Sequence, residues 1–169
     1  MKLKLSSIIA TIFFALFAPA ASAQQTNCTL LVDSATVGAV RAFWESTDVE
    51  VVSACIKAGA NVNARTTGSY ANMGYTPLHQ AAQFNDNPAV INTLILLGAK
   101  VNVRNEAGAT PLHEAASYGN PAVVTALIMS GAVGNARNMF GQMPYDLAQK
   151  NPDLKGSDAY WALSDARFK

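Results

Sequence analysis

The 169-residue chain has few charged residues, few histidines and few cysteines, and each shortage excludes a class of function. Charged residues make up 14% of the chain and nearly balance, whereas a nucleic-acid partner would need a basic stripe. The two cysteines do not stand at metal-ligand spacing. Phosphate-binding glycine motifs and the G-x-S-x-G nucleophile motif are absent. We therefore predict no nucleic-acid partner, no metal, no cofactor and no catalytic residues.

Long apolar runs are also missing, except at the N-terminus. Lys2 and Lys4 precede an apolar stretch at 5–18, and a small-residue site follows at 21–23. This order is typical of a secretory signal peptide, so we expect cleavage after Ala23 and a periplasmic or secreted protein. The alternative, an uncleaved anchor, would need about 20 apolar residues. Cleavage changes the formal net charge from +1 to −1, and no later segment is long enough to span a membrane.

What the chain does contain is an internal repeat. The segments 75–104 and 109–137 share Thr-Pro-Leu-His, then Ala-Ala, Asn-Pro-Ala-Val, an apolar stretch and Gly-Ala. Weaker copies lie at 48–65 and 141–151. A period of about 33 residues with Thr-Pro-Leu-His-x-Ala is the ankyrin signature. The chain resembles the ankyrin-repeat family over about residues 38–168.

The two ends of the chain resemble a particular subgroup of the family. Small exported bacterial ankyrin-repeat proteins carry a Phe-Trp helix before two full repeats and a closing helix after them, which Phe43-Trp44 and 154–163 match. The resemblance implies an all-α solenoid of helix-turn-helix units with β-hairpin fingers, in which two full repeats are flanked by capping units. The predicted divisions are a signal peptide (1–23), an N-terminal segment (24–37) and an ankyrin-repeat domain (38–169), with units at about 38–65, 66–104, 105–137 and 138–169.

Each motif residue has an expected structural role. The threonine can cap a helix, and the proline suits the first helical position, where a missing N–H costs nothing. In the family, the histidine bonds the motif's threonine and neighbouring backbone, which ties adjacent repeats together. These structural residues are Thr76, Pro77, His79, Thr110, Pro111 and His113.

One alternative for the histidines is an exported metal-dependent enzyme. His113 and Glu114 begin the zinc motif H-E-x-x-H, but Ser117 stands where the second histidine is required. His79 and His113 are one repeat apart, too far to share a zinc ion with Zn–N bonds of about 2.0–2.1 Å. We therefore expect a structural role for both.

Three further features concern the first half of the chain. Thr47 and Glu50 have the spacing of a capping box. In an exported chain, Cys28 and Cys55 predict a disulfide worth roughly 3 kcal/mol. The alternative is that Cys55 is a small buried hydrophobe and Cys28 a free thiol. The first finger carries about five extra residues within 66–74, which are either part of the binding side or a tolerated insertion.

The resemblance implies that a protein partner contacts the finger tips and the first helix of each unit. Phe84 and Tyr118 occupy equivalent positions and are expected to form an aromatic stripe, because aromatic residues are enriched at binding hot spots; alternatively they shield a helix junction. We predict a monomeric, non-enzymatic interaction module of the bacterial cell envelope, with a secreted effector acting on host proteins as the alternative. The candidate contact residues are Tyr70, Met73, Gln80, Phe84, Glu106, Glu114, Ser117, Tyr118 and Phe140.

Overall fold

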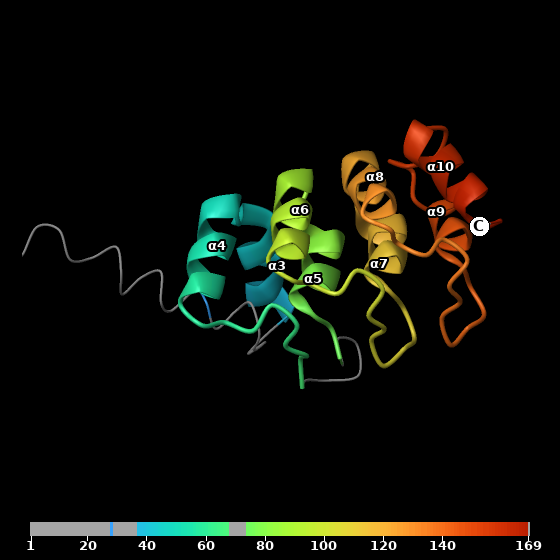
Figure 1. The fold of residues 1–169 in the computed structure, drawn as a ribbon. Helices are drawn as coiled ribbons and strands as arrows, with labels where there is room; N and C mark the ends of the chain where they lie inside the picture. The colour runs from blue at the N-terminus through green and yellow to red at the C-terminus, as the bar shows by residue number, and fades with distance from the viewer. Residues whose placement is uncertain (1–27, 29–36, 68–73, 169) are drawn as a thin grey trace, which may run out of the picture.

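The computed structural model describes Cys28, residues 37–67 and residues 74–168. Within these ranges the helices come in pairs that succeed one another along the chain (Figure 1). Their bounds are α3 (Val37–Ser46) and α4 (Val49–Lys57), α5 (Pro77–Phe84) and α6 (Pro88–Leu96), α7 (Pro111–Tyr118) and α8 (Pro121–Met129), and α9 (Pro144–Ala148) and α10 (Asp158–Ala166).

The pairs stack into two rows. The first helices pack in the order α3, α5, α7 and α9, and the second helices in the order α4, α6, α8 and α10. The colour in Figure 1 accordingly runs from blue to red along the stack, with the finger loops projecting on one side. This arrangement confirms the predicted helical repeat stack.

The fingers are loops in the part that the structure describes, which contains no β-strand. In the second finger the Asn105 N–H donates to the Ala109 carbonyl, and the Gly108 N–H donates to the Asn105 carbonyl. The loop thus closes after one turn and leaves too few residues for a strand ladder. The predicted β-hairpin form of the fingers is therefore not confirmed. Tyr70 and Met73 lie outside the described residues.

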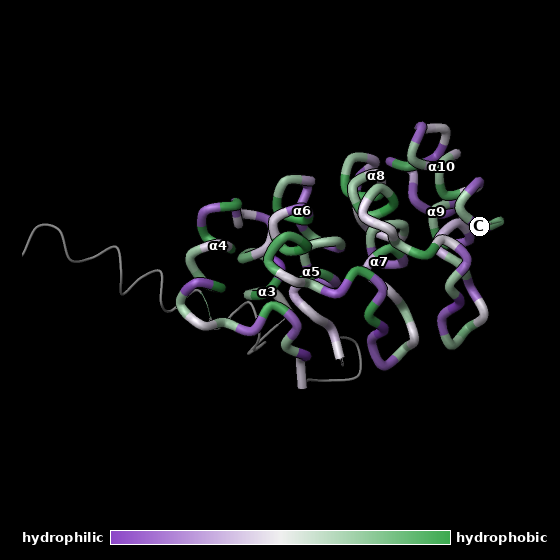
Figure 2. The backbone as a smooth tube through the Cα atoms, viewed as in Figure 1, coloured by the Kyte–Doolittle hydropathy of each residue, from purple (hydrophilic) through white to green (hydrophobic). Residues whose placement is uncertain are grey.

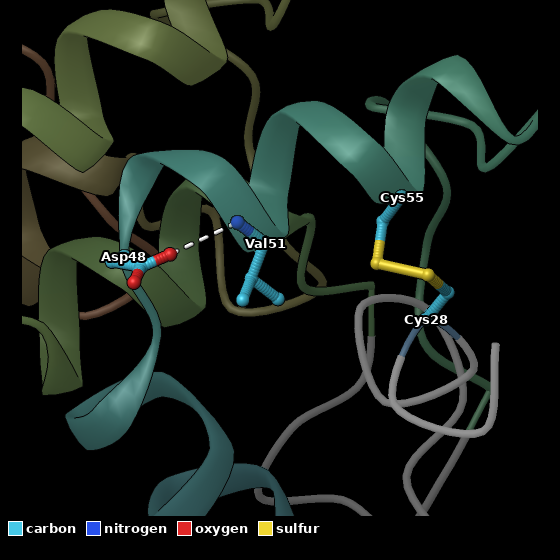
Figure 3. Close-up of a disulfide and its surroundings, with 4 residues drawn as sticks. All are labelled: Cys28, Asp48, Val51 and Cys55. Carbon is cyan, nitrogen blue, oxygen red and sulfur yellow. Dashed lines mark hydrogen bonds between the residues drawn. A yellow bond between two sulfur atoms is a disulfide. The ribbon is translucent and has the colours of Figure 1, made fainter. Parts of the chain in front are cut away.

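The helix starts follow the expected chemistry with one correction. Proline occupies the first turn of α5 to α9. The predicted capping box of Thr47 and Glu50 is wrong, because Asp48 caps α4 by accepting a 2.9 Å hydrogen bond from the Val51 N–H (Figure 3). The Thr47 hydroxyl instead donates to the Phe43 carbonyl at the end of the preceding helix.

The core lies between the two rows of helices. Leu78 and Leu112 from the first helices belong to one buried cluster with Ile91 and Leu127 from the second helices, and all four are fully buried. The apolar sequence accordingly concentrates in the helices, most clearly in α8, whereas hydrophilic residues are frequent in the fingers (Figure 2). Paired alanines on α5 and α7 are buried as well, which allows neighbouring helices to approach closely.

The first unit is tied to an N-terminal residue by the predicted disulfide. Cys28 and Cys55 are bonded, with their Cα atoms 5.2 Å apart, and Cys55 is a buried residue of α4 (Figure 3). The described residues include no helix that is long and apolar enough to cross a membrane.

Candidate partner-binding surface

The motif histidine of the first full repeat is fully engaged by the protein. The Thr76 N–H donates to His79 Nδ1 at 3.2 Å, so this nitrogen must be unprotonated. The proton is therefore on Nε2, which donates to the Ala109 carbonyl at 3.1 Å. The Thr76 hydroxyl lies 3.0 Å from Nδ1, and Thr76 and His79 together form a capping box at the start of α5.

The second full repeat has the same arrangement. The Thr110 N–H donates to His113 Nδ1 at 3.1 Å, and His113 Nε2 donates to the Gln142 carbonyl at 3.1 Å. Burial lowers the pKa of His79 to about 4 and also lowers the pKa of His113. Both rings are neutral at pH 7 and join one unit to the base of the next finger, as predicted.

No metal-binding cluster surrounds the histidines in the part of the chain that the structure describes. The described residues contain no group of three or more His, Cys, Asp or Glu side chains placed to hold a metal ion. Since each ring nitrogen already has a protein partner, neither histidine has a lone pair or proton available for chemistry.

Arginines and asparagines add a second set of links between units. Arg65 donates to the Arg104 carbonyl at 2.5 Å, and Arg104 donates to the Arg137 carbonyl at 2.6 Å. Asn63 and Asn102 donate in the same way to glycine carbonyls of the following unit, at 2.8 and 3.0 Å. The Asn-x-Arg that recurs at the end of the first three units was the sequence signal for these links, which hold the fingers in a fixed relation.

Two candidate contact residues are buried, which corrects the expectation that their side chains face a partner. Gln80 is 2% exposed and Glu114 is 6% exposed. Gln80 Oε1 accepts from Trp44 Nε1 at 2.9 Å, and Glu114 Oε1 accepts from the Tyr75 hydroxyl at 2.8 Å. Both side chains therefore hydrogen-bond to residues in the preceding part of the stack.

Burial also sets the protonation of the Glu114 site. It raises the pKa of Glu114 to about 7, although the hydrogen bond from Tyr75 works in the opposite direction. Burial, with the adjacent Glu114 carboxylate, raises the pKa of Tyr75 far above its usual range, so the phenol remains a donor. Asn105 Nδ2 lies 3.4 Å from the same carboxylate oxygen. The site is a structural polar contact inside the stack.

The other candidates are at the surface to different degrees. Tyr118 is 66% exposed and Phe140 is 72% exposed, and Met139 beside Phe140 is exposed too. Glu106 is exposed and forms a 3.8 Å ion pair with Arg65. Phe84 and Ser117 are half-buried.

Phe84 and Tyr118 do lie on one surface feature, a hollow of about 620 Å³ that we call the cross-unit groove. The ring contacts found among the described residues do not include this pair, so the aromatic stripe is not a stack of two rings. The residues that line the groove are Arg41, Glu45, Gln83, Phe84, Asp86, Tyr118 and Asp153.

The fold and surface define a helical repeat protein that displays side chains on a fixed frame. A sequence model of ankyrin repeats, comprising three copies, matches residues 38–138, and the chain belongs to the ankyrin-repeat family. It is also 36% identical over 69 residues to an ankyrin repeat protein of fowlpox virus (strain NVSL). That match covers 41% of this chain and 19% of the viral protein. Ankyrin repeats indicate a protein–protein interaction module, and the family is generally non-enzymatic.

Proposed function

We propose that this protein is a monomeric, non-enzymatic interaction module of the bacterial cell envelope. It binds a protein partner through its finger tips and first helices. The observation that carries the proposal is the exposure of Tyr118, Met139 and Phe140 on elements held by the histidine, arginine and asparagine links. A frame fixed in this way loses little conformational entropy on binding.

The proposed location draws support from two features. The N-terminal 23 residues have the order of a signal peptide, and a disulfide between Cys28 and Cys55 is typical of an oxidising compartment. Fractionation of a C-terminally tagged protein tests this location. We expect the tag in the periplasm, at the mass of a chain cleaved after Ala23; recovery from the cytosol at full length would contradict export.

The partner-binding surface is tested by affinity capture from a periplasmic extract. The bait variant replaces Tyr118, Met139 and Phe140 with alanine. A matched control replaces three exposed large side chains at or beyond the ends of the second helices, namely Leu96, Met129 and Phe168. We expect wild type and control to retain the same protein and the bait variant to lose it. Equal recovery with all three would contradict the assigned surface.

A further inference from the structure

The cross-unit groove is lined by residues from every unit of the stack. Arg41 and Glu45 come from α3, and Gln83 and Phe84 come from α5. Three single residues complete the lining: Tyr118 from α7, Asp86 from the loop after α5, and Asp153 from the loop after α9. A groove that crosses successive units is longer than one side chain, so its shape suits an extended segment.

The groove carries an excess of negative charge. Its single guanidinium, on Arg41, is already paired with Glu45 at 2.7 Å. Asp86 accepts only a neutral donor in the described structure, Asn120 Nδ2 at 3.0 Å. Lys150 and Lys155 belong to the same loop as Asp153 but do not line the groove. The two aspartates therefore leave the groove two negative charges in excess.

The groove also has an aromatic wall, and one of its lining residues, Gln83, has an unsatisfied acceptor. The Tyr118 ring is largely exposed and Phe84 is half-buried beside the same hollow. Gln83 Oε1 is the one buried side-chain polar atom among the described residues without a hydrogen-bond partner. A group that fits this lining should be cationic, flat enough to stack on an aromatic ring, and rich in N–H donors.

The arginine side chain has all three properties. Its guanidinium is planar, carries five N–H donors and stacks on aromatic faces, whereas a lysine ammonium is a compact and strongly hydrated charge. We infer that the cross-unit groove binds an arginine-bearing extended segment of the protein partner. Its guanidinium packs on Tyr118 and pairs with Asp86 and Asp153. This inference rests on the proposed function and adds the chemistry of the partner.

Peptide titration tests the inference directly. The probe is an acetylated and amidated heptapeptide of alternating glycine and arginine with a fluorescent label, and the comparison peptides carry lysine or glutamate in place of arginine. We expect the arginine peptide to bind about three times more tightly than the lysine peptide, because stacking on the ring favours the guanidinium. The glutamate peptide should not bind.

Three variants of the full chain assign the contacts. Replacing Asp86 and Asp153 with asparagine keeps their size and should weaken binding about tenfold, since two partly exposed ion pairs are lost. Tyr118→Leu should weaken it about threefold. The charge-matched control, Glu50→Gln with Asp165→Asn, removes two exposed carboxylates on α4 and α10 and should leave affinity unchanged.

Several outcomes would overturn the inference. These are equal binding of arginine and glutamate peptides, equal binding of arginine and lysine peptides, no effect of the double aspartate change, or no binding to wild type. A thermal melt of each variant shows that it is folded. If affinity capture still recovers a partner that depends on Tyr118, Met139 and Phe140, failure of the peptide removes only the groove assignment and the proposed function stands.

Discussion

The two full repeats use the same connecting residues but carry different side chains, with different hydrogen-bond partners, at one buried position. In both repeats a histidine joins the motif's backbone to the next finger, with almost identical distances. One residue after each histidine, the first repeat has Gln80 and the second has Glu114. Gln80 meets the indole of Trp44, whereas Glu114 meets the phenol of Tyr75.

The comparison shows that variation between repeats does not by itself mark a binding surface. Gln80 and Glu114 differ because their neighbours in the preceding part of the stack differ, and both are buried. Variation at Phe84 and Tyr118, by contrast, falls on the cross-unit groove. A difference between repeats can therefore specify either the adjacent unit or a partner, and only burial separates the two cases.

The largest expected loss of stability follows from removing the motif histidine that both full repeats share. His79→Ala and His113→Ala each leave a buried threonine N–H without a partner, and the carbonyl of the next finger keeps only its backbone donor. The unsatisfied N–H costs about 1–3 kcal/mol and the cavity left by the buried imidazole adds to this cost, so we expect each variant to lose about 3–4 kcal/mol of unfolding free energy. For a chain of this size the melting temperature should fall by roughly 10 °C.

Urea unfolding followed by circular dichroism at pH 7 measures both variants, with Lys150→Ala as an exposed control. The two histidine variants should agree within about 1 kcal/mol, because their hydrogen bonds match. A loss of unfolding free energy in one variant and none in the other would show that the shared histidine does not stabilise both repeats equally.

Reduction of the disulfide should destabilise the units to different degrees, most strongly the unit that contains it. Opening the Cys28–Cys55 loop should lower stability by about 3 kcal/mol, and Cys28→Ser should make the protein insensitive to reductant. Units in a repeat stack contact only their neighbours. Amide exchange should therefore increase most in α4, less in α6 and least in α8. A uniform increase, or no response of the wild type to reductant, would contradict this prediction.

The carboxyl group of Glu114, which distinguishes the second repeat, should make stability depend on pH. Burial raises the pKa of Glu114 from its ordinary value of 4.5 to about 7 in the folded protein. The folded state therefore binds the proton more tightly than the unfolded state. The stabilisation that this provides is present below pH 4.5 and is lost as the pH rises from 4.5 to about 7. The loss should amount to about 3 kcal/mol.

Comparison with Glu114→Gln isolates this carboxyl group. The pKa of His79 is lowered to about 4, so its contribution changes in the opposite sense and is lost as the pH falls below 6.5. Wild type minus Glu114→Gln cancels the histidines, and this difference in unfolding free energy should fall between pH 4.5 and 7. Gln80→Glu should introduce a similar fall in the first repeat. Parallel pH profiles for wild type and Glu114→Gln would contradict the assignment.

The sequence predicted those features that recur within it. The repeat stack, the helix starts at proline and the role of His79 and His113 all follow from residues that appear twice at one spacing. Burial of Gln80 and Glu114 could not be predicted in this way, because it depends on Trp44 and Tyr75, which lie 36 and 39 positions away from them.

Local competition between similar residues explains another error. Thr47 and Asp48 are both good helix caps, and the spacing from Thr47 to Glu50 favoured the threonine. The structure uses Asp48, because the Thr47 hydroxyl is already bonded to the Phe43 carbonyl. A capping pattern identifies where a helix begins to within a residue, and here a hydrogen bond to the end of the preceding helix occupies one of the two candidate caps.

The smallest expected loss of stability follows from replacing the asparagines that link successive units. Asn63 accepts from the Lys100 N–H and Asn102 from the Val133 N–H, both at 2.9 Å, in addition to the bonds they donate. These links are near solvent, so water replaces the lost partners, and we expect Asn63→Ala and Asn102→Ala to cost about 1 kcal/mol each.

Asn135 provides the matched control at the next boundary. It has the same register in its unit, but no side-chain hydrogen bond to the last unit is found for it in the described part of the chain. Asn135→Ala should therefore change the unfolding free energy by less than about 0.5 kcal/mol. Equal costs for all three variants would mean that residue type, and not the link to the next unit, sets the effect. A cost at Asn63 and Asn102 alone would show that both full repeats are held by the same bond, and that the last unit is joined without it.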